Sequence, residues 1–167
     1  DYVEVPYHSS LDCERSVSLT AWAKSDLEGR EYAADGVIAQ MGFAAEEAYY
    51  VGYHRGTNSM IGVYRNHWGW TAAGEAVDYD GGLHSPIPLD KAWHFYAITF
   101  DGDSLRLYVD TRLVGTIVAY PGPIRDTPLR IGAQAKSLAR YFHGSIDEVR
   151  VYNRPLSALE ISAVARR

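Results

Sequence analysis

The stretch from Trp93 to Gly115, WHFYAITFDGDSLRLYVDTRLVG, constrains the fold most, because apolar and polar residues alternate in runs joined by a turn. In the second run Leu105, Leu107 and Val109 share one parity, so they would lie on one face of a strand. Asp101-Gly102 separates the runs and is typical of a hairpin turn. A third apolar run follows directly. The stretch therefore predicts a β-meander with one face against a core.

Short runs of β-favouring residues, separated by Gly- and Pro-rich turns, occur along the whole chain. They predict strands at Tyr2–Val5, Val17–Ala23, Val37–Met41, Tyr49–Tyr53, Met60–Tyr64, Trp93–Phe100, Leu105–Val109, Val114–Val118, Leu129–Ile131 and Gly144–Tyr152. Many short strands with such turns are typical of an antiparallel β-sandwich. Only the C-terminus looks helical, because Ser157 and Glu160 have the spacing of a capping box. We expect an all-β fold with a short helix at Ala158–Ala165.

The composition limits the class of protein. A chain of 167 residues with 47% hydrophobic and 22% charged residues predicts a single globular domain, residues 1–167. The net charge of −5 and the lack of a basic stripe argue against nucleic-acid binding. We expect neither a signal peptide nor membrane insertion, because the sequence contains no apolar stretch near membrane-spanning length. Cys13 is the only cysteine, which excludes an internal disulfide and predicts either a small packed residue or a partly exposed thiol.

Five segments carry a family likeness: SVSLTAWAKSD, WHFYAITFDG, LRLYVDTRLVG, LRIGA and GSIDEVRVYNRPLSALEI, in that order. Together they resemble the laminin-G-like, concanavalin A-like lectin/glucanase superfamily, in a branch typical of bacterial secreted proteins. The likeness runs from Asp1 to Ile161, with a variable middle from Ala44 to Leu89. It implies a jelly roll of two curved sheets. It also implies an extracellular or cell-surface module that binds a polysaccharide or glycoconjugate and is attached to other domains of a parent protein.

The chain departs from the family pattern in two places. Such domains usually have an apolar strand ahead of the segment that matches DYVEV, whereas this chain begins at Asp1. We therefore expect a domain excised from a larger protein, or a first strand supplied in another way. At Asp110-Thr111-Arg112 the family commonly has Asp-Gly, a difference that should change only the turn.

Two aspartates are candidate calcium ligands. Asp147 shares its parity with Val149 and Val151, so it would point toward the core, where a carboxylate needs a partner. Asp1 raises the same question at the start of the chain. Calcium prefers hard oxygen ligands, and the aspartate that matches Asp147 in related domains resembles a calcium ligand. We expect a structural calcium ion at Asp147 and Asp1, with backbone N–H bonds to Asp147 as the alternative.

The segment from Tyr53 to Gly82 is the candidate ligand-binding region, because it combines aromatic rings with Asn, Asp and Arg side chains. Rings stack on the C–H faces of sugars, and these polar groups bind hydroxyls in concave sites. The alternative is that the rings are core residues and the polar residues lie in solvated loops. The candidate residues are Tyr53, Arg55, Tyr64, Arg65, Asn66, His67, Trp68, Trp70, Asp78 and Tyr79.

Motifs for catalysis are missing from the sequence. The related glucanases carry Glu-x-Asp-x-x-Glu on one strand, which this chain lacks, and Glu46-Glu47 would point to opposite faces of a strand. The six histidines have no zinc-binding spacing. Carboxylates on different strands could still converge, so an enzyme stays open.

The sequence leaves three functional hypotheses. The first is a non-catalytic, lectin-like, calcium-stabilised carbohydrate-binding module, and the second is a structural, protein-interaction or adhesion module. The third is a glycan-degrading enzyme. A groove with aligned aromatic rings would favour the first, and a flat charged surface the second. Two carboxylates about 5–9 Å apart in a cleft would favour the third.

Overall fold

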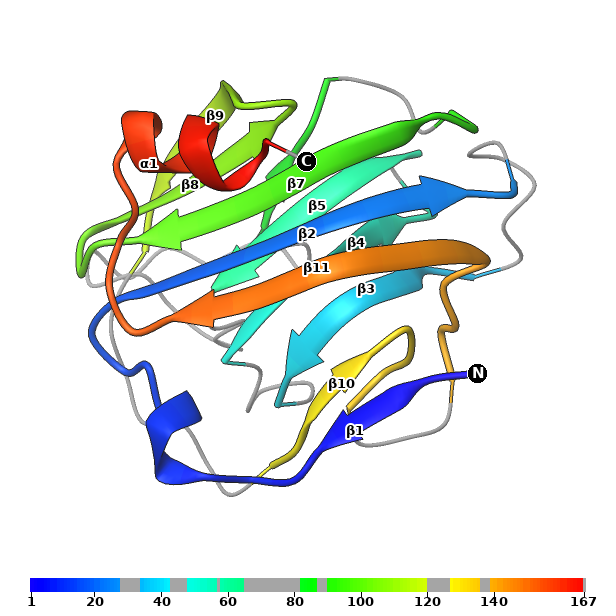
Figure 1. Cartoon of the computed structure of the whole chain (residues 1–167), viewed down its shortest axis with the longest axis horizontal. Coiled ribbons are helices and arrows are strands. Elements are labelled where there is room, and N and C mark those ends of the chain that lie inside the picture. The colour runs from blue at the N-terminus through cyan, green and yellow to red at the C-terminus, as the bar shows by residue number, and fades with distance from the viewer. Residues whose placement is uncertain are drawn as a thin grey trace.

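The structure, a computed structural model, describes residues 1–27, 34–42, 48–56, 58–64, 82–86, 90–119, 127–135 and 139–166. Figure 1 shows two β-sheets packed face to face, with a short helix on the outside of one of them. In these ranges no helix is both long and apolar enough to cross a membrane.

Eleven strands form the two sheets in the described ranges. The six-stranded sheet contains, in spatial order, β1 (Val3–Val5), β10 (Leu129–Ile131), β3 (Gly36–Met41), β4 (Tyr49–His54), β5 (Ser59–Tyr64) and β6 (Leu83–His84). The five-stranded sheet contains β11 (Gly144–Tyr152), β2 (Val17–Ser25), β7 (Trp93–Phe100), β8 (Ser104–Val109) and β9 (Arg112–Val118). Neighbouring strands pair antiparallel, which confirms the predicted all-β sandwich.

The predicted meander is formed by β7, β8 and β9. Asp110 and Thr111 make the second turn, with φ angles of 48° and 67° in the left-handed region. Two left-handed central residues are the pattern of a type I′ turn, whose twist matches that of the strands it joins. The Asp110 carboxylate accepts the Phe95 N–H at 3.0 Å, and the Asp110 N–H donates to the Phe95 carbonyl at 2.8 Å. The turn is therefore tied to β7.

The main core lies between the inner faces of the two sheets. Burial of one large apolar side chain there stabilises the fold by about 1.5–3 kcal/mol. The ring of Tyr64 on β5 stacks on that of Phe100 on β7, with centroids 3.8 Å apart. The largest fully buried side chains of this core are Leu19, Ile38, Met41, Tyr49, Tyr53, Met60, Ile98, Phe100, Leu105 and Leu107. Cys13 is buried beside them, as expected of a packed residue.

Helix α1 (Ala158–Val164) covers part of the outer face of the five-stranded sheet (Figure 1). Ile161 packs there in a cluster with Phe95 and Tyr108. The predicted capping box is confirmed, because Ser157 Oγ accepts the Glu160 N–H while the Glu160 carboxylate accepts the Ser157 N–H at 2.8 Å. A short 3-10 helix at Ser9–Leu11 precedes β2.

The two sheets approach each other closely at Gly62 on β5. A Cβ at this position would overlap Cγ2 of Ile98 and lie 3.2 Å from a Leu107 methyl. Because Ile98 is fully buried and branched at Cβ, it has little room to move. We expect Gly62→Ala to lower the free energy of unfolding by about 1–3 kcal/mol, measured by urea denaturation.

The control is the same substitution in an Ile98→Ala background. There the overlap disappears, so Gly62→Ala should cost much less. An equal loss in both backgrounds would show that the two sheets do not meet at this point.

Candidate functional site

Several loops converge at the end of the sandwich where β2 ends and where β7 and β11 begin. Ser25 pairs with Gly144 and Lys24 with Trp93 at this end of the five-stranded sheet. A hydrogen bond of 2.9 Å joins the Asp26 N–H to the His143 carbonyl. The N-terminus lies on the same side of the molecule (Figure 1). We call the described parts of these loops the rim: residues 1–2, 25–27, 34–36, 54–56, 58, 90–94, 110–111 and 139–143.

The two candidate tyrosines of the described chain lie in the core. Tyr53 and Tyr64 are 0% and 2% exposed. The Tyr53 hydroxyl donates to Asn58 Oδ1 at 2.8 Å, beside the rim, and the Tyr64 hydroxyl donates to the Glu14 carbonyl at 2.6 Å, at the opposite end. The structure does not bring these rings together, and their burial favours the alternative, packing, over stacking on a sugar.

Arg55 lies on the rim, and its role as a ligand residue stays a prediction. Its backbone N–H donates to Asp35 Oδ1 at 2.8 Å, and Asp35 Oδ2 lies 3.3 Å from a guanidinium nitrogen of Arg140. Asp35 therefore links the β4–β5 turn to the segment that leads into β11. The other candidates lie outside the described residues, and their role stays a prediction: Arg65, Asn66, His67, Trp68, Trp70, Asp78 and Tyr79.

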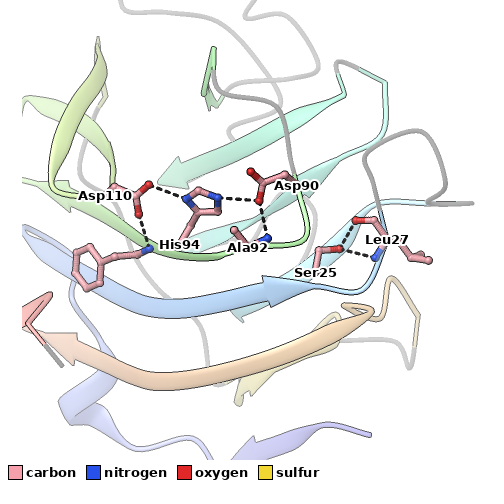
Figure 2. Close-up of polar contacts among 7 residues, drawn as sticks. Ser25, Leu27, Asp90, Ala92, His94 and Asp110 are labelled. Atoms are coloured by element: carbon pink, nitrogen blue, oxygen red, sulfur yellow. Dashed lines mark hydrogen bonds and ion pairs between the residues drawn. The ribbon is translucent and has the colours of Figure 1, made fainter.

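A histidine held between two carboxylates lies elsewhere on the rim (Figure 2). His94 Nδ1 is 2.6 Å from Asp110 Oδ2, and His94 Nε2 is 2.9 Å from Asp90 Oδ1. Asp90 also accepts the Ala92 N–H at 2.7 Å. We call Asp90, His94 and Asp110 the His94 clasp, because they tie the loop before β7 to the β8–β9 turn.

The electrostatics of the clasp favour a charged imidazole. Partial burial lowers the pKa of His94, but the hydrogen bonds to Asp110 and Asp90 outweigh it, so that the net pKa is raised. The Ala92 N–H and, to a smaller extent, His94 lower the pKa of Asp90. Both ring nitrogens are engaged, so the clasp acts as a fastener rather than as an acid or base facing a ligand. The sequence hinted at it only through the Asp90-x-x-x-His94 spacing.

An open pocket lies at the rim where the N-terminus meets the segment before β11. Its volume is about 630 Å³, and the described residues that line it are Asp1, Tyr2, Tyr141, Phe142 and His143. These residues come from the two ends of the sequence, so no local motif marked the pocket. A small molecule could enter it, since ligand pockets commonly have about 300–1,000 Å³.

Comparison with known protein families identifies the family of the chain. A family model of the laminin-G type, described as concanavalin A-like lectin/glucanases superfamily, matches residues 1–162. The chain belongs to this superfamily. The resemblance carried by the five sequence segments is thereby confirmed. No curated protein matches the chain.

Solved structures of the superfamily fold share the architecture at low identity. A proposed carbohydrate-binding protein from Bacteroides ovatus has a TM-score of 0.71 at 16% identity, covering 96% of this chain and 43% of that one. Botulinum neurotoxin type C, whose cell entry depends on two ganglioside molecules, has a TM-score of 0.67 at 11% identity, with coverage of 98% and 39%. A heptameric SAP-like pentraxin from Limulus polyphemus has a TM-score of 0.60 at 13% identity, with coverage of 91% and 70%. The chain spans less than half of the first two proteins.

Asp147, the first calcium candidate, does not point into the sandwich. A β-bulge shifts the β2–β11 register between Asp147 and Arg150, and Glu148 has a left-handed φ of 53°. Ile146 and Val149 consequently both pack on the core, and Asp147 is exposed. The expectation that Asp147 shares a face with Val149 was wrong, because strict alternation leaves no room for the extra residue of a bulge.

Both calcium candidates, Asp1 and Asp147, are exposed. The Asp147 carboxylate accepts the Glu148 N–H at 2.8 Å, which is the alternative considered from the sequence. Asp1 is exposed and lines the pocket. Across the described ranges no three His, Cys, Asp or Glu side chains form a group that could hold a metal. A structural calcium ion in this superfamily member stays a prediction.

The clasp predicts a pH-dependent stability. A raised His94 pKa means that its contribution is complete below the ordinary value of 6.5 and is lost as the pH rises through the folded value. A lowered Asp90 pKa means that its contribution is present above 3.8 and is lost as the pH falls through the folded value. The clasp should thus stabilise the fold most between about pH 3.8 and about pH 6.5, where Asp90 is ionised and His94 is charged.

We expect His94→Gln to lower the free energy of unfolding by about 1 kcal/mol near pH 6, and by progressively less at alkaline pH. Urea denaturation from about pH 5 to about pH 9 measures the difference in the free energy of unfolding between the variant and the unmodified chain. His8→Gln is the matched control, since in the described part of the chain the His8 ring contacts Ser10 and no carboxylate. A difference for His94→Gln that stayed constant across this pH range would contradict the predicted contribution of the clasp.

The geometry of Asp147 makes a second prediction. Because its carboxylate caps the bulge, we expect Asp147→Ala to lower the free energy of unfolding by about 1 kcal/mol or less, equally with calcium and with chelator. Thermal unfolding under both conditions measures this. A loss seen only with calcium would assign Asp147 to a metal site after all.

Proposed function

We propose that this chain is a non-catalytic binding module for a glycan or glycoconjugate and works in a larger extracellular or cell-surface protein. The observation that carries the proposal is the rim pocket, where the exposed rings of Tyr2 and Tyr141 lie with Asp1 and His143 around an open cavity. Flat rings beside groups that bind hydroxyls are what a sugar site requires.

The similar structures support a binding role. Among them are a proposed carbohydrate-binding protein, a neurotoxin whose cell entry depends on gangliosides, and a neurotoxin binding domain in complex with SialylT. These ligands belong to those proteins. Their recurrence in one fold is the reason for choosing sugars as the class of ligand for this chain.

The arrangement of the titratable cluster supports a module that is not an enzyme. In the His94 clasp the imidazole and the two carboxylates are directed at one another. A general acid or base needs an atom facing the substrate, and the clasp directs neither ring nitrogen outward. Its role is to hold the rim loops in place.

An adhesion or protein-interaction module is the second candidate, favoured by exposed apolar residues on the edge strands. Val3 on β1 is 57% exposed, and Val118 on β9 is 69% exposed. Exposed edge strands can add a strand from a partner.

Thermal unfolding against a panel of soluble glycans tests the proposal. The panel contains mannan, laminarin, lactose and 3′-sialyllactose. A ligand that binds only the folded chain should stabilise it by about 2.7 kcal/mol at a hundredfold excess over Kd, which raises the Tm by about 5–10 °C. Calcium and chelator arms of the same experiment measure any contribution of the ion.

A Tm that rises with one glycan and not with the others, together with retention on that immobilised glycan, would agree with the proposal. No shift and no retention with any member of the panel would contradict it and favour the adhesion module.

A further inference from the structure

The described walls of the rim pocket contain two exposed tyrosines and one buried phenylalanine. Tyr2 is 41% exposed and Tyr141 is 36% exposed, whereas Phe142 is 8% exposed and belongs to the core. The guanidinium carbon of Arg130 lies 5.4 Å from the centroid of the Tyr2 ring. This cation–π contact helps to fix that ring in one orientation. The described walls thus combine aromatic rings, which can contact the C–H groups of a ligand, with hydroxyls, which can bind its polar groups.

The backbone that carries the pocket is held from several sides. Tyr141 forms an isolated bridge with Val37, and the Phe142 N–H donates to the Gly132 carbonyl at 3.1 Å. Gly132 has a φ of +85°, and a Cβ there would lie 3.3 Å from the Asp1 carbonyl. Glycine therefore lets the N-terminal strand approach β10 closely. A wall fixed in this way loses little conformational entropy when a ligand binds.

The charges around the pocket select against an acidic ligand. Arg130 is paired with Glu4 at 2.8 Å, and Arg140 with Asp35 at 3.3 Å. Among the described residues that line the pocket, Asp1 carries the one carboxylate, and none is Lys or Arg. A sugar carboxylate would be repelled by Asp1, whereas a sugar hydroxyl can donate a hydrogen bond to it.

We propose that this pocket is a subsite for a neutral pyranose, which stacks on Tyr2 or Tyr141 and donates hydroxyl hydrogen bonds to Asp1. The inference rests on the proposed function. It places the subsite outside the segment from Tyr53 to Tyr79 that the sequence marked, and it gives Asp1 the role of a hydroxyl acceptor.

Isothermal titration with lactose and mannan as neutral probes and 3′-sialyllactose as the acidic probe tests the inference. Tyr2→Ala and Tyr141→Ala should each weaken binding of the neutral sugar by about tenfold or more, as truncation of an anchoring ring does. Tyr2→Phe and Tyr141→Phe retain the rings and should bind within about threefold of the unmodified chain.

The matched control is Tyr7→Ala, since Tyr7 is 37% exposed and lies outside the pocket walls. It should bind within about twofold of the unmodified chain. Asp1→Ala changes an exposed residue at the first position, so it tests the pocket even if an alanine variant of a tyrosine fails to fold. It should weaken neutral binding about tenfold and strengthen sialyllactose binding.

The possible outcomes distinguish a failure of the proposed subsite from a failure of the proposed function. Loss of neutral binding in the pocket variants with the control unchanged supports the inference. Unchanged binding in the pocket variants, with loss in Trp68→Ala or Trp70→Ala, overturns the inference and leaves the proposed function standing. Preference for sialyllactose overturns the neutral subsite. No binding of any probe by the unmodified chain overturns both.

Discussion

The packing of the two sheets across their inner faces is the contact on which the rest of the molecule depends. Ile98 of β7 faces Gly62 of β5 with no space for another carbon, and Tyr64 stacks on Phe100. Because the sheets are locked together along the middle of their strands, the strand ends have fixed positions. Loops that are far apart in sequence can therefore meet at one end, where the rim forms.

The rim is fastened by polar contacts rather than by core packing. Asp35 joins the β4–β5 turn to Arg140, and His94 joins two further loops through its paired carboxylates. Each such contact between partly exposed groups contributes little to stability by itself. Their value lies in holding the pocket walls in one arrangement, and a prearranged wall is what a shallow sugar site needs in order to bind at all.

Sequence periodicity predicted the strands well, most clearly where buried apolar residues line a strand, as in β7 and β8. Trp93–Phe100, Leu129–Ile131 and Gly144–Tyr152 have the expected bounds. The two-residue strand β6 was too short to give a period. Asp147 was placed on the wrong face, because a bulge adds a residue that alternation does not count. The His94 clasp was missed because it depends on the pairing of β7 with β8, which brings Asp110 beside His94. The pocket was missed because it joins the two ends of the sequence.

Chemical-shift mapping of the backbone amides during titration with a bound neutral glycan tests the central claim, that ligands bind at the rim. The account predicts that the shifted amides of the described chain cluster at residues 2, 34–36, 54–56 and 139–143. The chemical shifts of amides at the opposite end, residues 13–16, 101–103 and 153–156, should not change. Shifts confined to that opposite end, or to the outer face covered by α1, would contradict the account.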